Sequence, residues 1–414
     1  VASEQSAFCN KVNNYIILKN NDICEISKLK NNNISISTKN FYKNIKVLNR
    51  NIQLTPSPYK FWTEKEIYEQ SESSLRAISL GGRLLLNNKV KLGGLDEFKD
   101  ELEKIDNLII LGCGTSLFAG YVSKYYFKEL CSFNTIQVID GAEFLLSDIP
   151  KIGKTAFILL SQSGETKDLH RCIEMCKEKD IIKIGVINVV DSLISREVDC
   201  GCYLNAGREV GVASTKAFTS QVIILSMIAI WFSQIHNINN HKRQKYVKDL
   251  RNLHVDIKKL LNDINITKYI EFFNNNSCFI LGKGKEEYIA KEGALKLKEI
   301  SYIHAEGYSS SSLKHGPFAL LKKDFPIILI ILNNEFRYKN MNAYEEIKSR
   351  HAKILVITDI PQLEVEHKIL IPYNNSFNDI LSVIPLQLLA FHLSLKNGNN
   401  VDMPRNLAKV VTVE

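Results

Sequence analysis

The stretches Leu108-Ile-Ile-Leu-Gly112-Cys-Gly114 and Phe279-Ile-Leu-Gly282-Lys-Gly284 decide the fold. In each, a short apolar strand ends in a Gly-x-Gly turn, and a helical pattern follows. One such turn is a weak signal, because it also serves plain helix packing. Its recurrence at the head of two similar series of strands and helices indicates an internal duplication. The sequence therefore predicts an α/β protein with two tandem, doubly wound parallel sheets, Rossmann-like sandwiches whose ligands bind beyond the carboxyl ends of the strands.

Both series continue with strands that alternate with turns and helices. The predicted strands of the first series are Leu108–Leu111, Ala156–Leu160, Ile184–Ile187 and Tyr203–Leu204, and those of the second are Cys278–Leu281, Ile327–Leu332, Ile354–Ile357 and Ile369–Ile371. A helical stretch is predicted at about 63–87. The apolar run Val222–Phe232 is too short to span a bilayer and predicts a buried helix, so no membrane association is expected.

The first residues have a different pattern. Residues 1–54 alternate short apolar runs with Asn- and Lys-rich turns, which predicts part of a β-rich domain with runs at Tyr15–Leu18, Ile23–Ile26, Ile34–Ile36 and Ile45–Leu48. The two prolines of Thr55-Pro-Ser-Pro58 indicate a linker. The expected division is 1–54, a linker and helical segment at 55–102, one sheet domain at 103–242, the other at 243–400, and a tail at 401–414. Because the chain starts at Val1, we expect it to be part of a longer protein.

The composition limits the function classes. With 414 residues, of which 45% are hydrophobic, the chain can bury two cores. The net charge of +8 comes from 53 basic and 45 acidic residues without a dense basic stripe, so no nucleic-acid partner is expected, whereas an anionic sugar phosphate would suit the excess. The nine cysteines have the spacing of neither a disulfide framework nor a zinc site, so we expect no metal and a cytoplasmic location. Cys172 and Cys176 are predicted core residues of an amphipathic helix.

Ser161-Gln-Ser163-Gly164-Glu165-Thr166 is the strongest local motif. It joins a predicted strand to a predicted helix, where unpaired backbone N–H groups form an anion site. A plain helix cap would need only one hydroxyl, whereas this stretch has three hydroxyls and a glycine, which favours phosphate. The P-loop lysine is missing, so a nucleoside triphosphate is disfavoured. Nothing comparable follows Ile327–Leu332, so one module is expected to hold the phosphate while the other contributes something else.

Two further groups are catalytic candidates. Glu292, Lys296 and Glu299 are spaced i, i+4 and i+7 on one helical face. The spacing alone favours a surface salt-bridge ladder, and the alternative is a carboxylate base tuned by an ammonium group. His315 precedes Gly316-Pro317, and such a turn suits a positioned acid/base and a structural cap equally.

Together these motifs resemble the isomerase part of the glutamine:fructose-6-phosphate aminotransferases, which consists of two SIS (sugar isomerase) domains. The resemblance covers about 60 to 414, in order and at the spacing of that family. The matching stretches are Cys113-Gly-Thr-Ser116, Ser161-Gln-Ser-Gly-Glu-Thr166, Val212-Ala-Ser-Thr-Lys-Ala-Phe-Thr219, Glu292-Gly-Ala-Leu-Lys-Leu-Lys-Glu-Ile-Ser-Tyr-Ile-His-Ala-Glu306, Leu313-Lys-His-Gly-Pro317, Pro404-Arg-Asn-Leu-Ala-Lys409 and Val411-Thr-Val-Glu414. Residues 1–54 resemble the last part of the glutaminase domain of the family, and Ser311-Ser312 replaces its usual Gly-Glu.

The resemblance implies a role for each matching residue. The phosphate would be bound by Ser161, Gln162, Ser163 and Thr166, and the sugar would be lined by Thr115, Ser116, Val212 and Ala408. Glu299 would move a proton between C1 and C2, assisted by Lys296. Lys409 would form a Schiff base with the keto carbon. His315 would open the sugar ring from a neighbouring subunit, which implies a homodimer or higher homo-oligomer.

The expected reaction is therefore the amination and isomerisation of fructose 6-phosphate to glucosamine 6-phosphate, the first step of hexosamine synthesis, with no cofactor. We expect the chain as given to use ammonium but not glutamine, because the N-terminal cysteine nucleophile of the family is absent from it. The alternatives are a non-catalytic sugar-phosphate sensor and another phosphosugar isomerase. A sensor would need the phosphate loop but neither Glu299 nor Lys409.

Overall fold

The computed structural model describes residues 12–18, 22–31, 33–46, 55–274 and 277–410 of the chain. The chain divides into two compact units, Val1–Pro58 and Tyr59–Glu414. The first unit contains two antiparallel strand pairs: β1 (Asn14–Tyr15) with β4 (Ile45–Lys46), and β2 (Cys24–Lys28) with β3 (Ile34–Thr38). The predicted β character of this segment is confirmed. The predicted end of its last run, Leu48, lies outside the described residues.

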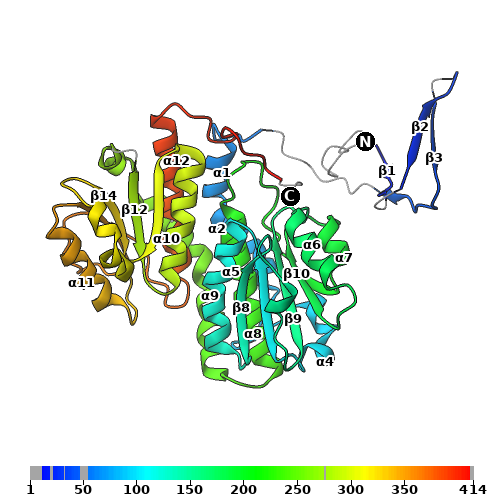
Figure 1. The fold of residues 1–414 in the computed structure, drawn as a ribbon, viewed down its shortest axis with the longest axis horizontal. Helices are drawn as coiled ribbons and strands as arrows, with labels where there is room; N and C mark the ends of the chain where they lie inside the picture. The colour runs from blue at the N-terminus through cyan, green and yellow to red at the C-terminus, as the bar shows by residue number, and fades with distance from the viewer. Residues whose placement is uncertain (1–11, 19–21, 32, 47–54, 275–276, 411–414) are drawn as a thin grey trace. The chain divides into compact units, whose positions relative to one another are not determined.

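Two five-stranded parallel sheets form the framework of the second unit (Figure 1). The strands of the first sheet are β7 (Asn107–Gly112), β8 (Thr135–Asp140), β9 (Thr155–Ser161), β10 (Ile182–Ile187) and β11 (Cys200–Tyr203). Those of the second are β12 (Ser277–Gly282), β13 (His304–Ser309), β14 (Pro326–Ile330), β15 (Lys353–Thr358) and β16 (Lys368–Leu370). The spatial orders, β8-β7-β9-β10-β11 and β13-β12-β14-β15-β16, are the same, which confirms the predicted duplication and fold class.

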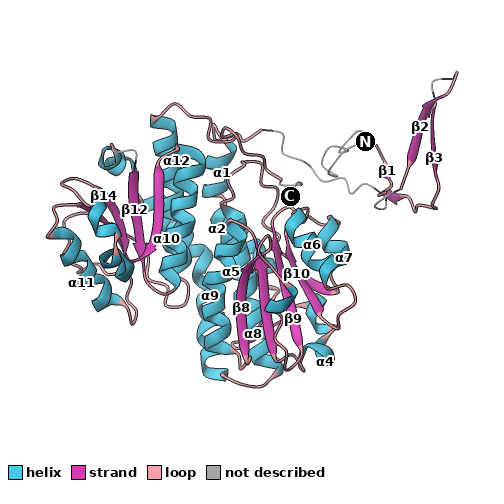
Figure 2. Cartoon of the chain, viewed as in Figure 1, coloured by secondary structure: helices cyan, strands magenta, loops and turns pink. Residues whose placement is uncertain are grey.

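Helices cover both sheets (Figure 2). The main helices of the first module are α5 (Thr115–Leu130), α6 (Lys167–Met175), α7 (Leu193–Glu197) and α8 (Lys216–Ile235). Those of the second module are α10 (Lys285–Lys296), α11 (Arg337–Lys348) and α12 (Asn378–Lys396). The long helix α9 (Asn240–Asp263) links the two modules. Short helices also occur between these elements, among them α3 (Gly93–Asp96), α4 (Lys99–Leu102), η3 (Leu146–Asp148) and η4 (Thr267–Phe273).

One hydrophobic core runs through both modules. Helix α5 of the first module packs on α10 of the second, where the rings of Tyr121 and Tyr288 stack with centroids 4.5 Å apart. Two helices, α8 and α12, are long and apolar enough to cross a membrane, but 89% of each such window is buried inside the protein. They are therefore core helices, as predicted for Val222–Phe232.

The structure corrects three secondary-structure predictions. The helical stretch at about 63–87 is instead α1 (Trp62–Tyr68), α2 (Gln70–Ala77), η2 (Ser79–Gly81) and a hairpin of β5 (Leu84–Leu85) and β6 (Lys89–Val90). Ser79 and Leu80 have positive φ angles, which end the helix. The strands β8 and β13 were not predicted. Both lie at sheet edges and lack a continuous apolar run, so pairing with β7 and β12 decides their conformation.

The strand order places the expected ligand site. After β7 the chain crosses to β8 on one side, and after β9 it crosses to β10 on the other. The carboxyl ends of β7 and β9 therefore flank the topological switch point of the first sheet, where doubly wound proteins bind ligands. The strand β7 ends just before Thr115, and β9 ends at Ser161. Two of the predicted binding stretches thus meet at this edge.

Candidate active site

The predicted phosphate loop is closed by its own hydroxyl groups. The Oγ of Ser161 lies 3.0 Å from the Oγ1 of Thr166 and accepts a hydrogen bond from the N–H of Gly164 at 2.9 Å. The Oγ of Ser163 accepts one from the N–H of Glu165 at 3.1 Å. Gln162 lies half-buried in the same loop. The four predicted phosphate residues are therefore gathered between the end of β9 and the start of α6, and their role in binding stays a prediction.

Gly164 is required by the loop geometry. Its φ of +70° lies in the left-handed region, and a Cβ at this position would come 1.9 Å from the Oγ of Ser192. Two hydrogen bonds also connect the loop to α7. The carboxylate of Glu165 accepts one from the backbone N–H of Leu193 at 3.0 Å, and the carbonyl of Gly164 accepts one from the N–H of Ile194 at 2.9 Å. The sequence did not reveal this holding role of Glu165.

We expect Ser163→Ala combined with Thr166→Ala to weaken fructose 6-phosphate binding about 10- to 100-fold. Each lost hydrogen bond to a charged group costs on the order of 1.5–3 kcal/mol, and the remaining donors of the loop offset part of this loss. Calorimetric titration measures the affinity. Ser195→Ala is the matched control, since this hydroxyl of α7 binds only the carbonyl of Ser192 at 2.8 Å. Equal affinities of the double variant and the control would refute the loop assignment.

The β7 side of the switch point is connected to both α8 and the second module. Ser116 accepts a hydrogen bond from the Nε2 of Gln221 on α8 at 2.8 Å. The Oγ1 of Thr115 accepts a hydrogen bond from the Nζ of Lys296 at 3.0 Å and donates one to the Oε1 of Glu292 at 3.2 Å. The first turn of α5 is therefore joined directly to the predicted catalytic helix, α10.

The surface ladder favoured by the spacing of Glu292, Lys296 and Glu299 is wrong. The side chains of Glu292 and Lys296 are 0% and 1% exposed, and that of Glu299 is 21% exposed. The helix also widens, because α10 ends at Lys296 and a π-helical turn, η5, spans Leu297–Ser301. This turn places a carboxylate oxygen of Glu299 2.6 Å from the Nζ of Lys296, while Glu292 lies 3.5 Å from it. A π-turn in a helix is often found at a functional site.

The two carboxylates have different environments. Burial raises the pKa of Glu292 to about 8, and the charge of Glu299 adds to the effect against the opposing influence of Lys296. Burial alone would lower the pKa of Lys296, but Glu292 and Glu299 raise it above its ordinary value. The triad therefore combines a fully buried carboxyl group of raised pKa with an ammonium group of raised pKa, and Glu299 is the more accessible of its two carboxyl groups.

The C-terminal tail reaches this region through three anchors. Asp402 accepts the N–H groups of Trp62 and Thr63 at the start of α1, at 2.9 and 2.8 Å. The backbone N–H of Arg405 donates a hydrogen bond to the hydroxyl of Tyr302 at 2.8 Å. The predicted sugar residue Val212 donates its N–H to the carbonyl of Asp402 at 3.0 Å, whereas Ala408 is exposed.

The third anchor is an ion pair of Lys409. Its Nζ lies 2.7 Å from the Oε2 of Glu209, whose side chain is 0% exposed. Sequence alone would have left Lys409 as a solvated tail residue. Burial opposes the ionisation of Glu209, but Lys409 and the nearby donors outweigh it and lower the pKa of Glu209 to about 2. Glu209 also contributes to the raised pKa of Lys296, so the two lysines belong to one electrostatic neighbourhood.

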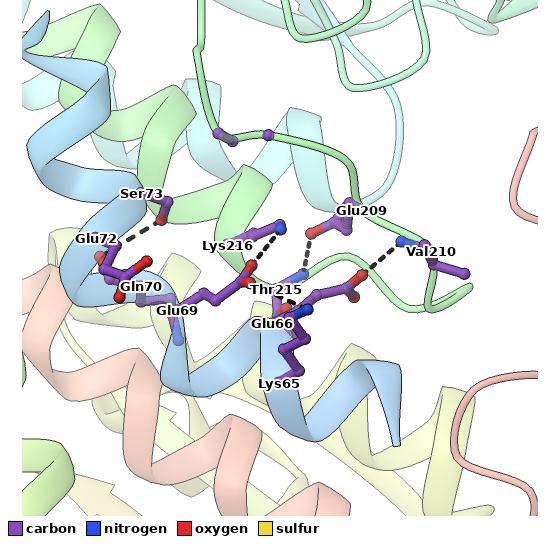
Figure 3. Close-up of polar contacts among 12 residues, drawn as sticks. Lys65, Glu66, Glu69, Gln70, Glu72, Ser73, Glu209, Val210, Thr215 and Lys216 are labelled. Carbon is purple, nitrogen blue, oxygen red and sulfur yellow. Dashed lines mark hydrogen bonds and ion pairs between the residues drawn. The ribbon is translucent and has the colours of Figure 1, made fainter. Parts of the chain in front are cut away.

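Helix α1 supports the segment that carries Glu209 (Figure 3). The carboxylate of Glu66 accepts the backbone N–H groups of Val210 and Gly211, and Lys216 pairs with Glu69 at 2.7 Å beside it. Glu66 is 1% exposed. Burial and the charge of Glu209 raise the pKa of Glu66 to about 8. No sequence motif pointed to Glu66 or Glu209 as a supporting group.

We expect Glu66→Gln to change the pH dependence of stability. The folded protein keeps a proton on Glu66 that the unfolded chain releases, so the free energy of unfolding falls as pH rises through the range between about 4.5 and about 8. The glutamine keeps a hydrogen-bond acceptor but cannot ionise. Relative to the parent protein, the variant should gain on the order of 1–3 kcal/mol between about pH 5 and about pH 9. Thermal unfolding at a series of pH values measures the difference. Stabilities of the variant and the parent that change with pH in the same way would contradict the prediction. Glu72→Gln, on the exposed face of α2, is the control.

His315 does not share the site of its own chain. It is exposed at the end of η6 (Ser310–His315), before η7 (Pro317–Leu320). Glu299 precedes the six-residue strand β13 and His315 follows it, so the two residues come before and after opposite ends of this strand. The structure therefore brings Glu299, Lys296 and Thr115 together within one chain but leaves His315 apart from them.

The corresponding crevice of the second module is filled. Gly284, at the end of β12, has a φ of +70°, and a Cβ there would lie 2.4 Å from the ring of Phe336. Next to it, Asn334 donates a hydrogen bond to the buried carboxylate of Glu286 at 3.0 Å. That the second module has no phosphate loop stays a prediction. Its contribution comes from the other end of α10.

The family of SIS domains matches residues 101–231 and 271–396. Over its full length the chain is 43% identical to a probable glutamine–fructose-6-phosphate aminotransferase [isomerizing] from Acanthamoeba polyphaga mimivirus and covers 68% of that protein. The chain belongs to the glutamine–fructose-6-phosphate aminotransferase family. It is also 36% identical to isoform 2 of this aminotransferase from Mus musculus, of which it covers 62%.

Within this aminotransferase family, the chain spans only about two thirds of the length of these relatives. A solved structure of the same family is also similar to this chain. The C-terminal domain of glucosamine-fructose-6-phosphate aminotransferase from Francisella tularensis superposes with a TM-score of 0.79 at 32% identity. The match covers 84% of this chain and 100% of that one. The resemblance stated from the motifs is therefore confirmed.

Proposed function

We propose that this chain converts fructose 6-phosphate and ammonia into glucosamine 6-phosphate and water, the first step of hexosamine synthesis. The names of its relatives support this activity. The observation that carries it is the convergence at one edge of the first sheet: the hydroxyl of Thr115 contacts Lys296, which pairs with Glu299, and Glu209 joins the same neighbourhood with Lys409.

Each of the predicted site residues would carry out a different part of the reaction. The phosphate loop would hold the substrate so that C1 and C2 face α10. Lys409 would form an imine with the keto carbon, and ammonia would displace it. Glu299 would then take a proton from C1 and return it to C2, since its carboxylate oxygen lies 2.6 Å from the Nζ of Lys296 and its side chain remains partly accessible. Lys296 and Thr115 would assist proton movement at the sugar oxygens.

We also propose that His315 opens the sugar ring of a neighbouring subunit in a homodimer or larger homo-oligomer. Its exposure, and its position after the strand β13 that Glu299 precedes, support this arrangement. Mixing inactive His315→Ala with inactive Glu299→Gln should restore activity, because mixed dimers then contain one complete site. No recovery after dissociation and reassembly of the two variants would contradict the proposal.

The eight cysteines among the described residues are free thiols, which supports the proposed cytoplasmic location. The domain division at 54, 102, 242 and 400 likewise remains a proposal, beside the unit boundary after Pro58 and the two SIS matches.

The decisive assay incubates the purified chain with fructose 6-phosphate and ammonium and measures glucosamine 6-phosphate, with glutamine as a second nitrogen donor. Product formation from ammonium is expected. Binding without any product would favour the sensor, and conversion to an aldose phosphate without nitrogen would favour a simple phosphosugar isomerase. The presence of both Glu299 and Lys409, each held in an ion pair, supports the aminotransferase over the sensor, which would need neither residue.

A further inference from the structure

We propose that Glu209 is a positioning residue of the reaction: its buried carboxylate fixes the amine of Lys409 at the sugar site and pairs with the positive nitrogen before and after imine formation. This inference rests on the proposed function, because it assigns a partner to the lysine that would form the imine.

Four donors hold the carboxylate of Glu209 in place. One oxygen, Oε1, accepts the backbone N–H groups of Thr215 and Ala217 at 2.9 and 3.1 Å. The other, Oε2, accepts the hydroxyl of Ser214 at 2.9 Å and the Nζ of Lys409 at 2.7 Å. Two of the donors belong to the start of α8, a 20-residue helix whose dipole favours a negative charge there. Glu209 is therefore a fixed anion rather than a mobile side chain.

Lys409 depends on this anion for its position. Between Arg405 and Lys409 the tail has only exposed residues, Asn406, Leu407 and Ala408. A lysine side chain at the end of such a segment samples many rotamers unless its head group is held. Among the contacts of the described residues, the pair with Glu209 is the one that fixes the Nζ of Lys409. A misplacement of about 1 Å can cost on the order of 10²-fold in rate.

The chemistry of the imine explains why a carboxylate suits this place. Overall, the ammonium group and the keto carbonyl combine to an iminium ion and water, and the nitrogen carries one positive charge before and after. In between, the ammonium gives a proton to solvent, the free amine adds to C2, and the C2 oxygen leaves as water after protonation. Glu209 can thus pair with the nitrogen at the start and at the end. In a buried site this attraction is only weakly screened.

Glu209 acts through Lys409 and not on the sugar, because both of its oxygens are occupied by protein donors. The carboxylate of Glu66 fixes the adjoining backbone at Val210 and Gly211. The pair of Lys216 and Glu69, also 2.7 Å long, lies beside this arrangement but does not involve Lys409. It therefore offers a matched control: the same type of buried ion pair in the same region, without the reactive lysine.

The test measures borohydride trapping of the fructose 6-phosphate adduct on the complete chain carrying Glu209→Gln, with Glu69→Gln as control. Trapping in Glu209→Gln should be slower by on the order of 10²-fold, while the Kd of fructose 6-phosphate stays within about twofold because the phosphate loop is untouched. Glu69→Gln should trap at the parental rate. A merely structural role would slow both variants in proportion to their loss of thermal stability.

Ser214→Ala gives a milder second variant in case Glu209→Gln unfolds. It keeps the charge of Glu209 but removes the hydroxyl on the oxygen that binds Lys409, so trapping should be about threefold to tenfold slower. Parental trapping rates in the folded Glu209 and Ser214 variants would overturn the positioning role. If the parent protein itself forms no adduct, the proposed function fails, and the assignment of a reactive lysine fails with it.

Discussion

Glu299→Gln is expected to lower turnover of fructose 6-phosphate by on the order of 10²- to 10⁴-fold, the range supplied by a general acid–base group. The amide keeps the shape of the side chain and can still bind Lys296, which lies 2.6 Å away, but it cannot accept the C1 proton. Exchange of that proton with solvent, followed by NMR in deuterated water, measures the step directly. Adduct trapping at Lys409 should persist, because it precedes proton transfer.

The matched control for this prediction lies on the same helix. Glu287 of α10 also forms an i,i+4 pair, with Lys291 at 2.8 Å, but both side chains are partly exposed and lie outside the triad. Glu287→Gln should therefore leave turnover unchanged, since such surface pairs contribute about 0–1 kcal/mol to stability. Parental proton exchange in Glu299→Gln would move the base to another residue, and Glu292 would be the first candidate.

Lys409→Arg should abolish borohydride-trapped adduct altogether. Arginine keeps its positive charge and can still pair with Glu209, so the tail remains anchored, but a guanidinium group does not lose its proton and cannot form the imine. Mass spectrometry of the intact chain after reduction measures the added sugar phosphate. Binding of fructose 6-phosphate should persist, because the phosphate loop is unchanged.

Lys396→Arg on α12 is the control, because this lysine also forms an ion pair, with Glu271 at 3.0 Å, and belongs to none of the predicted site stretches. It should trap adduct as the parent does. A sugar adduct in Lys409→Arg that maps to another lysine after proteolysis would reassign the nucleophile. The buried Lys296 would then be tested next, by the corresponding substitution.

The sequence by itself determined the doubly wound fold and its duplication. The buried strands β7 and β12 are apolar runs followed by Gly-x-Gly turns, and these are local signals that a single sequence displays. The phosphate loop is local too, since its hydroxyl groups and Gly164 lie within six consecutive residues. General rules for such sheets predict ligand sites beyond the carboxyl ends of the strands, whereas the strand order that defines the switch point comes from the structure.

Only the tertiary structure decided which charges are buried. The spacing of Glu292, Lys296 and Glu299 is the same on a surface and in an interface, and the packing of α10 against α5 removes them from water. The partnership of Lys409 with Glu209 joins residues 200 positions apart, which no local pattern encodes. Burial and long-range contact are properties of the folded chain, so the chemistry that they tune becomes visible only there.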